Sequence, residues 1–213
     1  MSVLVDLLPA EEQDAAAATL SGCPSVALPA GVVRTAARLP EAALLVVEEG
    51  VVLVTSLRPG ATRRMIVAVA GPGSILPPPA EDERLEPLVD SWLTSVCPGA
   101  YQQLLALPGA ARTIVEALSQ ELHERNASLA QFSSVRHVER VRDKLLQLAR
   151  THGRVVPGGV RLDLPLTHEL VGEMVGSARE TVTWAFQELA REGFVQRVGR
   201  TYRLAVRPEA LAS

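Results

Sequence analysis

Residues 167–206 predict two short helices that meet at a glycine and are followed by a hairpin. Thr167 can cap a helix that runs to Val175, because its hydroxyl can accept a hydrogen bond from a backbone N–H of the first turn. Gly176 suits the left-handed conformation that ends many helices. A second helix follows, because apolar residues recur at helical spacing. These residues are Val182, Ala185, Phe186 and Leu189.

Two details fix how these helices would join. Ser177 and Glu180 are three residues apart and predict a capping box at the start of the second helix. Gly172 lies where the two helices would cross, and only a very small residue there allows a close, steep crossing. The pattern therefore predicts a helix, a glycine turn and a helix.

Strands are predicted on both sides of this pair of helices. Residues 194–198 and 201–206 alternate around Gly199-Arg200, which is typical of a hairpin with a two-residue turn. A second hairpin is predicted from residues 155–156 and 160–164, because they flank Pro157-Gly158-Gly159. Residues 138–149 have a helical apolar spacing, so a helix should precede that hairpin.

The first hundred residues have a different pattern, in which short apolar runs are separated by glycine and proline turns. Several short strands at this spacing predict a small antiparallel roll or barrel. The predicted strands are residues 26–28, 43–47, 51–55 and 65–69.

A long helix is predicted over residues 112–132, because apolar side chains follow an alternating three-and-four spacing. That stripe is typical of a coiled-coil seam, so we expect a helix that dimerises; the alternative is a helix that packs on its own sheet. Arg125 interrupts one expected apolar position. The stripe consists of Val115, Leu118, Leu122, Leu129 and Phe132.

The charge is unevenly distributed along the chain. Residues 1–134 carry 8 arginines and 15 acidic residues, whereas residues 135–213 carry 13 basic and 9 acidic residues, so the net charges are -7 and +4. The basic part is the candidate for a polyanionic partner.

Cys23 and Cys97 are far apart in the sequence, which indicates neither a zinc-ligand spacing nor a disulfide framework. No metal site is expected. The first residues lack the pattern of a signal peptide and no apolar run reaches membrane-spanning length, so we expect a cytoplasmic protein without a membrane partner.

Residues 167–182, which end in Val-Gly-Ser-Ala-Arg-Glu-Thr-Val, resemble the carboxy-terminal domain of the Crp/Fnr family of bacterial transcription regulators. The resemblance implies an α+β chain with a cupin-like or jelly-roll antiparallel β-roll as sensor domain, a dimerisation helix and a winged helix-turn-helix. The corresponding domains are residues 1–110, 111–134 and 135–213. It further implies a homodimer that binds a near-palindromic site on double-stranded DNA and contacts RNA polymerase.

By that resemblance, Arg179 and Glu180 would read bases in the major groove, where a guanidinium can bond guanine and a carboxylate can accept from cytosine. The alternative is that Glu180 only caps the helix and Arg179 only contacts a phosphate. Trp184 stands where many members have Arg or Ser, and it would either contact a thymine methyl or sugar or cover the domain's own core. Phosphate contacts are expected from Thr167, Ser177, Thr181, Arg197, Arg200 and Arg203.

The family's sensor roll often holds a cyclic nucleotide through a Gly-Glu pair and an arginine followed by small residues. Here Gly73 is followed by Ser74-Ile75-Leu76 and three prolines, and Leu85 and Glu86 follow Arg84. A carboxylate beside an incoming phosphate is unfavourable, so we expect no control by cyclic AMP.

One cysteine near the start excludes a clustered iron-sulfur ligand set. All four histidines lie on or after the long helix, which disfavours a haem sensor in the roll. No cofactor is therefore expected, and the effector is unknown.

Two other classes of function compete with this interpretation. An enzyme would need a nucleophile with a base, a phosphate-binding loop or a metal cluster, and the sequence has none of these, so no enzymatic activity is expected. A sensor that acts through protein contacts or an unidentified small-molecule effector, without DNA binding, is disfavoured by the presence of Arg179 and Glu180.

Overall fold

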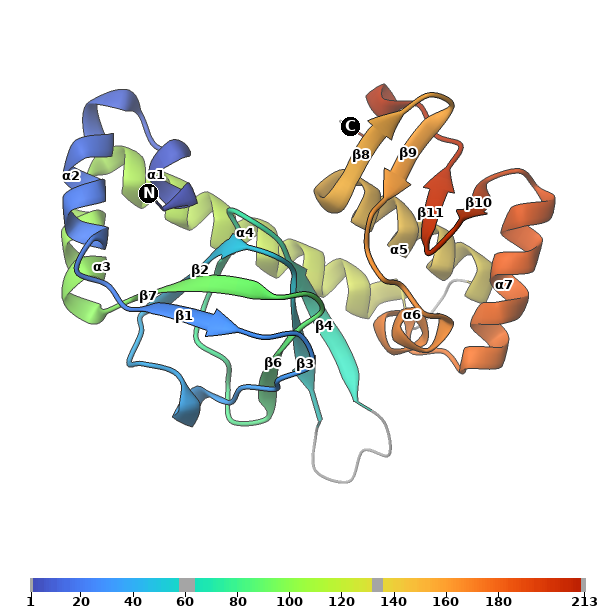
Figure 1. The fold of residues 1–213 in the computed structure, drawn as a ribbon, viewed down its shortest axis with the longest axis horizontal. Helices are drawn as coiled ribbons and strands as arrows, with labels where there is room; N and C mark the ends of the chain where they lie inside the picture. Colours follow the sequence, from blue (N-terminus) through green and yellow to red (C-terminus); the bar gives the residue numbers. More distant parts are fainter. Residues whose placement is uncertain (1, 58–63, 132–135, 212–213) are drawn as a thin grey trace. The chain divides into compact units, whose positions relative to one another are not determined.

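The computed structural model describes residues 2–57, 64–131 and 136–211. The chain forms two compact units, with the boundary between Asn126 and Ala127 (Figure 1). Because this boundary lies within the long helix α4 (Pro108–Gln131), most of that helix belongs to the first unit.

The first unit contains two antiparallel sheets with the strand orders β1-β7-β2-β5 and β4-β3-β6. All four predicted strands are confirmed as β1 to β4. The remaining strands, β5, β6 and β7, were not predicted. Strand β6 has a mostly polar sequence and is held by its ladder with β3. The strands are β1 (Ser25–Leu28), β2 (Leu44–Glu49), β3 (Val52–Ser56), β4 (Met65–Ala70), β5 (Ile75–Leu76), β6 (Glu83–Pro87) and β7 (Ser91–Val96).

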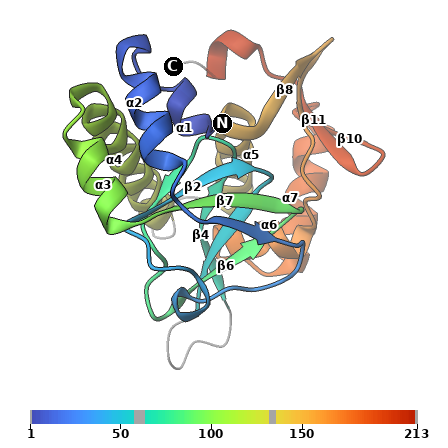
Figure 2. The same cartoon turned by 60° about the vertical axis from the view of Figure 1, so that its left-hand side comes forward.

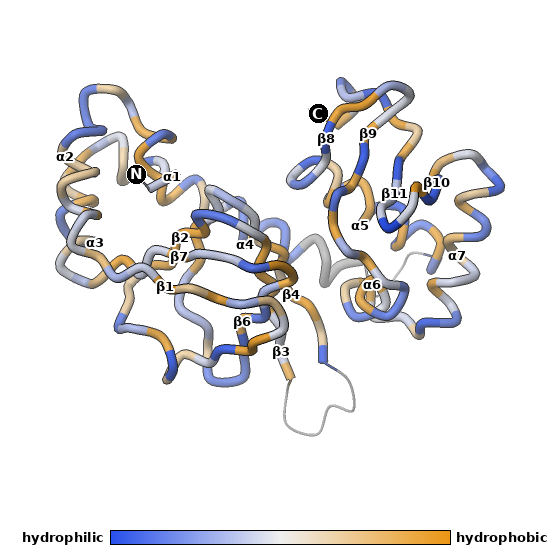
Figure 3. Tube along the Cα trace, in the orientation of Figure 1, coloured by the Kyte–Doolittle hydropathy of each residue, from blue (hydrophilic) through white to orange (hydrophobic). Residues whose placement is uncertain are grey.

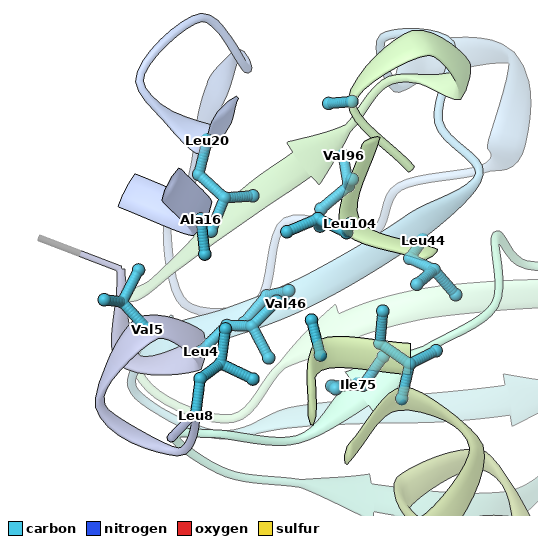
Figure 4. Packing of buried hydrophobic residues seen from close by; sticks show 13 residues of the cluster. Leu4, Val5, Leu8, Ala16, Leu20, Leu44, Val46, Ile75, Val96 and Leu104 are labelled. Atoms are coloured by element: carbon cyan, nitrogen blue, oxygen red, sulfur yellow. The ribbon is translucent and has the colours of Figure 1, made fainter. Parts of the chain in front are cut away.

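Strand β2 is buried on both faces, which explains its continuous apolar run. Leu45 and Val47 face β3 and β6 inside the roll. Leu44 and Val46 face the other way, into a cluster with helical residues such as Leu104 (Figure 4). Figure 3 shows hydrophobic stretches in orange along the strands of this unit.

Helices cover the outer face of the β1-β7-β2-β5 sheet. Figure 2 shows two of them, α2 and α3, side by side. Both carboxylate oxygens of Glu12, on α2, accept hydrogen bonds of 2.8 Å from the backbone N–H groups of Gly109 and Ala110, so α2 caps the first turn of α4. Helix α2 was not predicted, because alanine-rich segments show little periodicity. The helices are α1 (Val3–Asp6), α2 (Ala10–Leu20), α3 (Pro98–Leu105) and the 3-10 turn Ala36–Arg38.

The predicted long helix is confirmed as α4, and its apolar residues divide between two faces. Ile114 is buried in the unit's own core, and Leu118 packs against the same cluster. Val115 and Leu122 are 59% and 58% exposed. The helix therefore packs on its own unit, as the alternative expected, and also presents an apolar pair to the outside. The Leu129 side chain and Phe132 lie outside the described residues.

The second unit contains the predicted helices and hairpins, joined by a sheet with the strand order β10-β11-β9-β8. The hairpin predicted around Gly199-Arg200 is confirmed, and Val198 pairs with Thr201 beside the turn. Its elements are α5 (His137–His152), β8 (Gly153–Val156), β9 (Gly159–Leu162), α6 (His168–Val175), α7 (Arg179–Arg191), β10 (Val195–Val198), β11 (Thr201–Leu204) and the 3-10 turn Pro208–Leu211.

Cys23 and Cys97, which are far apart in the sequence, lie near each other in the first unit. Both are at the same end of the ladder between β1 and β7 and pack against the same apolar cluster. Their pairing depends on the ladder between β1 and β7, which residue spacing does not reveal.

No helix in residues 2–57, 64–131 and 136–211 is long and apolar enough to cross a membrane. In the same described part of the chain, no group of three or more His, Cys, Asp or Glu side chains is arranged to hold a metal ion.

Candidate nucleic-acid interface

Helix α6 begins and ends as its sequence predicts. The Thr167 hydroxyl accepts a 3.0 Å hydrogen bond from the Leu170 N–H. Gly176 adopts the left-handed conformation, with φ 62° and ψ 36°, where residues with a Cβ are disfavoured. These two residues limit α6 to two turns and direct the chain into α7.

Gly172 confirms the predicted close approach. A Cβ at this position would lie 2.6 Å from the carbonyl oxygen of Ser177, and the Ser177 N–H donates a 2.9 Å hydrogen bond to the Gly172 carbonyl. The turn thus lies directly on α6, and the start of α7 is held in place by backbone contacts.

The predicted capping box is wrong. The N-cap residue of α7 is Ala178, which provides no side-chain hydrogen bond. The Ser177 residue is 3% exposed, and its hydroxyl hydrogen-bonds Nδ1 of His137 on α5 at 2.9 Å. A buried hydroxyl with this partner cannot also reach a phosphate, so the expected phosphate contact of Ser177 is wrong.

Helix α7 has one buried face and one exposed face. Val182, Ala185, Phe186 and Leu189 are buried. The opposite face is exposed at four residues separated by four, three and four positions, which lie above one another on a helix. They are Glu180, Trp184, Gln187 and Arg191.

Two of the three candidate base-reading residues, Arg179 and Glu180, are exposed in the first turn of α7, and Glu180 begins this face. Trp184 is 52% exposed, so it does not serve mainly to cover the domain's core. Thr181 is half-exposed at the flank. Gln187 was not predicted as a member of this face, although its spacing from Glu180 and Trp184 could have identified it.

His168 connects α6, α7 and the hairpin β10-β11 electrostatically. Its Nδ1 hydrogen-bonds the Thr183 hydroxyl of α7 at 2.9 Å. Burial lowers the pKa of His168, and the positive charges of Arg197 and Arg179 lower it further. Arginines of α7 and of the hairpin thus both disfavour a positive charge on this imidazole.

The three arginines of the hairpin differ in their surroundings. Arg200 is exposed in the turn, and Arg197 is exposed beside it, with its Nε donating to the Gly199 carbonyl at 3.2 Å. Arg203 is half-buried; its guanidinium donates to the Gln196 side chain and, at 3.5 Å, to the Pro157 carbonyl. Arg197 and Arg200 are therefore better placed than Arg203 to meet a polyanion.

Residues 139–213 match the family model of the Crp-like helix-turn-helix domain. The chain is 31% identical over 94 residues to a CRP-like cAMP-activated global transcriptional regulator of Mycobacterium tuberculosis. The aligned segment covers 44% of this chain and 42% of that protein. The chain is 32% identical over 123 residues to the transcriptional regulator SdrP of Thermus thermophilus, covering 55% and 50%. The matches thus span half the length of these curated relatives or less.

Two solved structures share the fold over most of their length. A CooA variant from Carboxydothermus hydrogenoformans superposes with a TM-score of 0.75 at 19% identity, covering 92% of this chain and 88% of that one. FixK2 from Bradyrhizobium japonicum superposes with a TM-score of 0.71 at 22% identity, covering 89% and 96%. At these identities the likeness shows the fold.

Proposed function

We propose that this chain, which contains a Crp-like helix-turn-helix domain and shares the fold of CooA and FixK2, is a sequence-specific DNA-binding transcription regulator of the Crp/Fnr type. The observation that carries the proposal is the exposed polar face of α7, which begins with Arg179 and Glu180. A helix with such a face fits the major groove of B-DNA, where each base pair presents a distinct pattern of donors and acceptors.

Base reading is assigned to residues of that exposed face. The Arg179 guanidinium would form a forked contact to guanine, and the Glu180 carboxylate would accept from cytosine. Trp184 would contact a thymine methyl or a sugar, and the Gln187 amide could bond adenine. Half of Trp184 is exposed, which supports a role on the outer face.

Phosphate contacts are assigned to groups around α7. Arg197 and Arg200 of the hairpin are exposed and would bind the backbone as the wing of a winged helix-turn-helix. Arg203, Thr181 and Thr167 are secondary candidates, because the Arg203 guanidinium and the Thr167 hydroxyl have partners within the domain.

The regulator would act as a homodimer through α4. Val115 and Leu122 are seven residues apart and both exposed, as expected for one seam of a two-stranded coiled coil. A twofold dimer would place two α7 helices in successive major grooves, so the operator should be a near-palindrome. Such a protein would work in the cytoplasm and contact RNA polymerase, and no enzymatic activity is proposed.

Control by cyclic AMP is not proposed, because the residues near the expected phosphate site are engaged with one another. The Arg84 guanidinium donates to the Glu81 and Glu83 carbonyls, each at 2.7 Å. Arg125 of α4 pairs with the Glu83 carboxylate at 3.0 Å. An incoming phosphate would have to break these contacts beside acidic residues, so titration calorimetry with cyclic AMP should give no saturable heat.

The decisive test is selection of DNA by the purified full chain from a random pool, followed by binding measurements at several salt concentrations. We expect a near-palindromic consensus with a G·C pair in each half-site, and a logarithm of affinity that falls linearly with the logarithm of salt. No enrichment over the input pool would refute the proposal and favour a sensor that acts through protein contacts.

Tryptophan fluorescence can report directly whether Trp184 contacts the selected DNA. The chain has two tryptophans, and Trp92 lies on β7 in the first unit. In a Trp92→Phe variant only Trp184 emits, so the selected DNA should change the emission, whereas a Trp184→Phe variant serves as the matched control and should show little change.

A further inference from the structure

The first unit brings its two cysteines together from distant parts of the sequence. The Cys23 thiol donates a long hydrogen bond of 4.0 Å to the Thr19 carbonyl, and Cys97 lies close enough to influence its pKa. Both side chains also pack at the edge of the same apolar cluster. Both cysteines are free thiols and half-exposed, so a small reagent can reach them.

The backbone holds this pair in place independently of the thiols. In the ladder between β1 and β7, Ser25 is opposite Thr94. The ladder continues one step further, where the Ser95 N–H donates a 2.8 Å hydrogen bond to the Pro24 carbonyl. Cys23 precedes Pro24, and Cys97 lies two residues beyond Ser95, so the register brings both to the same end of the ladder.

Helix ends restrain both cysteines further. Cys23 follows α2, and its N–H donates a 2.9 Å hydrogen bond to the Leu20 carbonyl. Cys97 is the N-cap residue of α3. With Pro24 opposite Ser95, the ladder brings Cys23 opposite Val96, and Cys97 is the next residue along. The two thiols are therefore diagonal neighbours at the end of the ladder, and a local movement of these two helix ends would suffice to form a disulfide.

We propose that Cys23 and Cys97 form a reversible dithiol–disulfide site that hydrogen peroxide or an organic hydroperoxide oxidises. Disulfides within proteins of a reducing compartment, where the proposed function places this chain, are usually transient and redox-sensing. Two partly exposed thiols that lie near each other fit that use better than a purely structural role.

The chemistry balances with one peroxide for each pair. One cysteine, as its thiolate, attacks the peroxide O–O bond, which gives a sulfenic acid and releases water or an alcohol. The thiol of the other cysteine then attacks that sulfur, the S–S bond forms, and a second molecule of water leaves. The two thiols together lose two electrons and two protons, and the peroxide gains them.

The pKa of Cys23 fits a resolving role in this sequence. Burial raises the pKa of the Cys23 thiol, and a thiol with a raised pKa is a poor first nucleophile. Cys97 is the N-cap residue of α3, where the free backbone N–H groups of the first turn favour a negative charge, so we assign Cys97 as the residue that attacks the peroxide and Cys23 as the residue that completes the disulfide.

The test treats the reduced full chain with hydrogen peroxide and then measures its free thiols, its intact mass and its non-reducing peptide map. We expect both thiols to disappear together, a mass loss of two hydrogens, and a single crosslink between the peptides that contain Cys23 and Cys97. Dithiothreitol should restore both thiols. These readouts need no DNA, so they can succeed or fail independently of the proposed function.

Single variants complete the test. Cys23→Ser should trap Cys97 as a sulfenic acid, which a dimedone-type reagent labels, whereas Cys97→Ser should leave Cys23 labelled far more slowly. The site is overturned if each cysteine of the wild type gains oxygen separately, or if the disulfides join different chains. Equal labelling of the two variants would overturn the assignment of Cys97 as the attacking residue.

Discussion

The imidazole of His168 stacks on the ring of Phe186, with ring centroids 4.7 Å apart and planes inclined by 20°. Phe186 in turn packs against Tyr202, with centroids 4.9 Å apart. The three rings connect α6, α7 and β11, so the exposed helix and the hairpin share one aromatic core. The orientation of the candidate DNA-binding face therefore depends in part on a half-buried histidine whose pKa is lowered.

Acidification should weaken the second unit through His168. Its pKa is lowered in the folded protein, chiefly by burial, whereas the unfolded chain takes up the proton near pH 6.5. The stability that depends on neutral His168 is complete above that pH and is lost as the pH falls through 6.5 toward the folded-state pKa. Urea unfolding at pH values from 8 to 5 should show this loss.

His168→Phe keeps an aromatic ring but cannot be protonated, so its unfolding free energy should fall less on acidification than that of the wild type. Thr183→Val is the matched control, because it removes the hydrogen bond to His168 and keeps the titrating ring. Equal pH dependence in the wild type and His168→Phe would contradict the assignment.

Gly172→Ala should destabilise the second unit by about 1–3 kcal/mol. The new Cβ would lie 2.6 Å from a backbone carbonyl oxygen, so either α6 or the turn must move. Gly99→Ala in α3 is the control, since a Cβ there meets nothing within 4 Å and alanine favours a helix. Denaturant unfolding of both variants measures the difference, and a neutral effect of Gly172→Ala would mean that the crossing is looser than the structure has it.

Arg179→Ala should lower the affinity for the selected operator by about 1–3 kcal/mol and relax specificity at one base pair. Arg200→Ala should weaken operator and random DNA alike and reduce the salt slope by about one unit, because phosphates carry no sequence information. Fluorescence anisotropy with both DNAs at several salt concentrations makes the comparison. If Arg179→Ala weakens both DNAs equally, Arg179 contacts only the backbone.

The double variant Val115→Glu, Leu122→Glu should be a folded monomer, because both side chains point away from their own unit and would place charges in the seam. Gln120→Arg, on the polar side of α4, should leave the dimer intact. Light scattering and circular dichroism report assembly and folding. A persistent dimer in the double variant would place the interface elsewhere. Leu118→Glu should instead lower the stability of the first unit, since Leu118 packs against its core.

Local patterns in the sequence were sufficient for the elements that form the candidate interface. The cap at Thr167, the left-handed Gly176 and the apolar spacing of α7 each act within a few residues, so α6, its turn and α7 could be predicted from the sequence. The strands β1 to β4 were predictable for the same reason, because alternation and turn residues are local signals. Arg179 and Glu180 were assigned by the resemblance to the Crp/Fnr family, and Trp184 was left open between a DNA contact and the domain's core until the structure placed it on the surface.

Contacts between distant segments could not be predicted in this way. The Ser177 hydroxyl looked like a local cap, but the packing of α5 offers it His137, 40 residues away. The face of α4 that meets its own unit became visible only once Glu12 and the apolar cluster were in place. Cys23 and Cys97 are neighbours because of the register of β1 on β7. Register and helix packing depend on the energy of the whole core, which no short stretch of sequence contains.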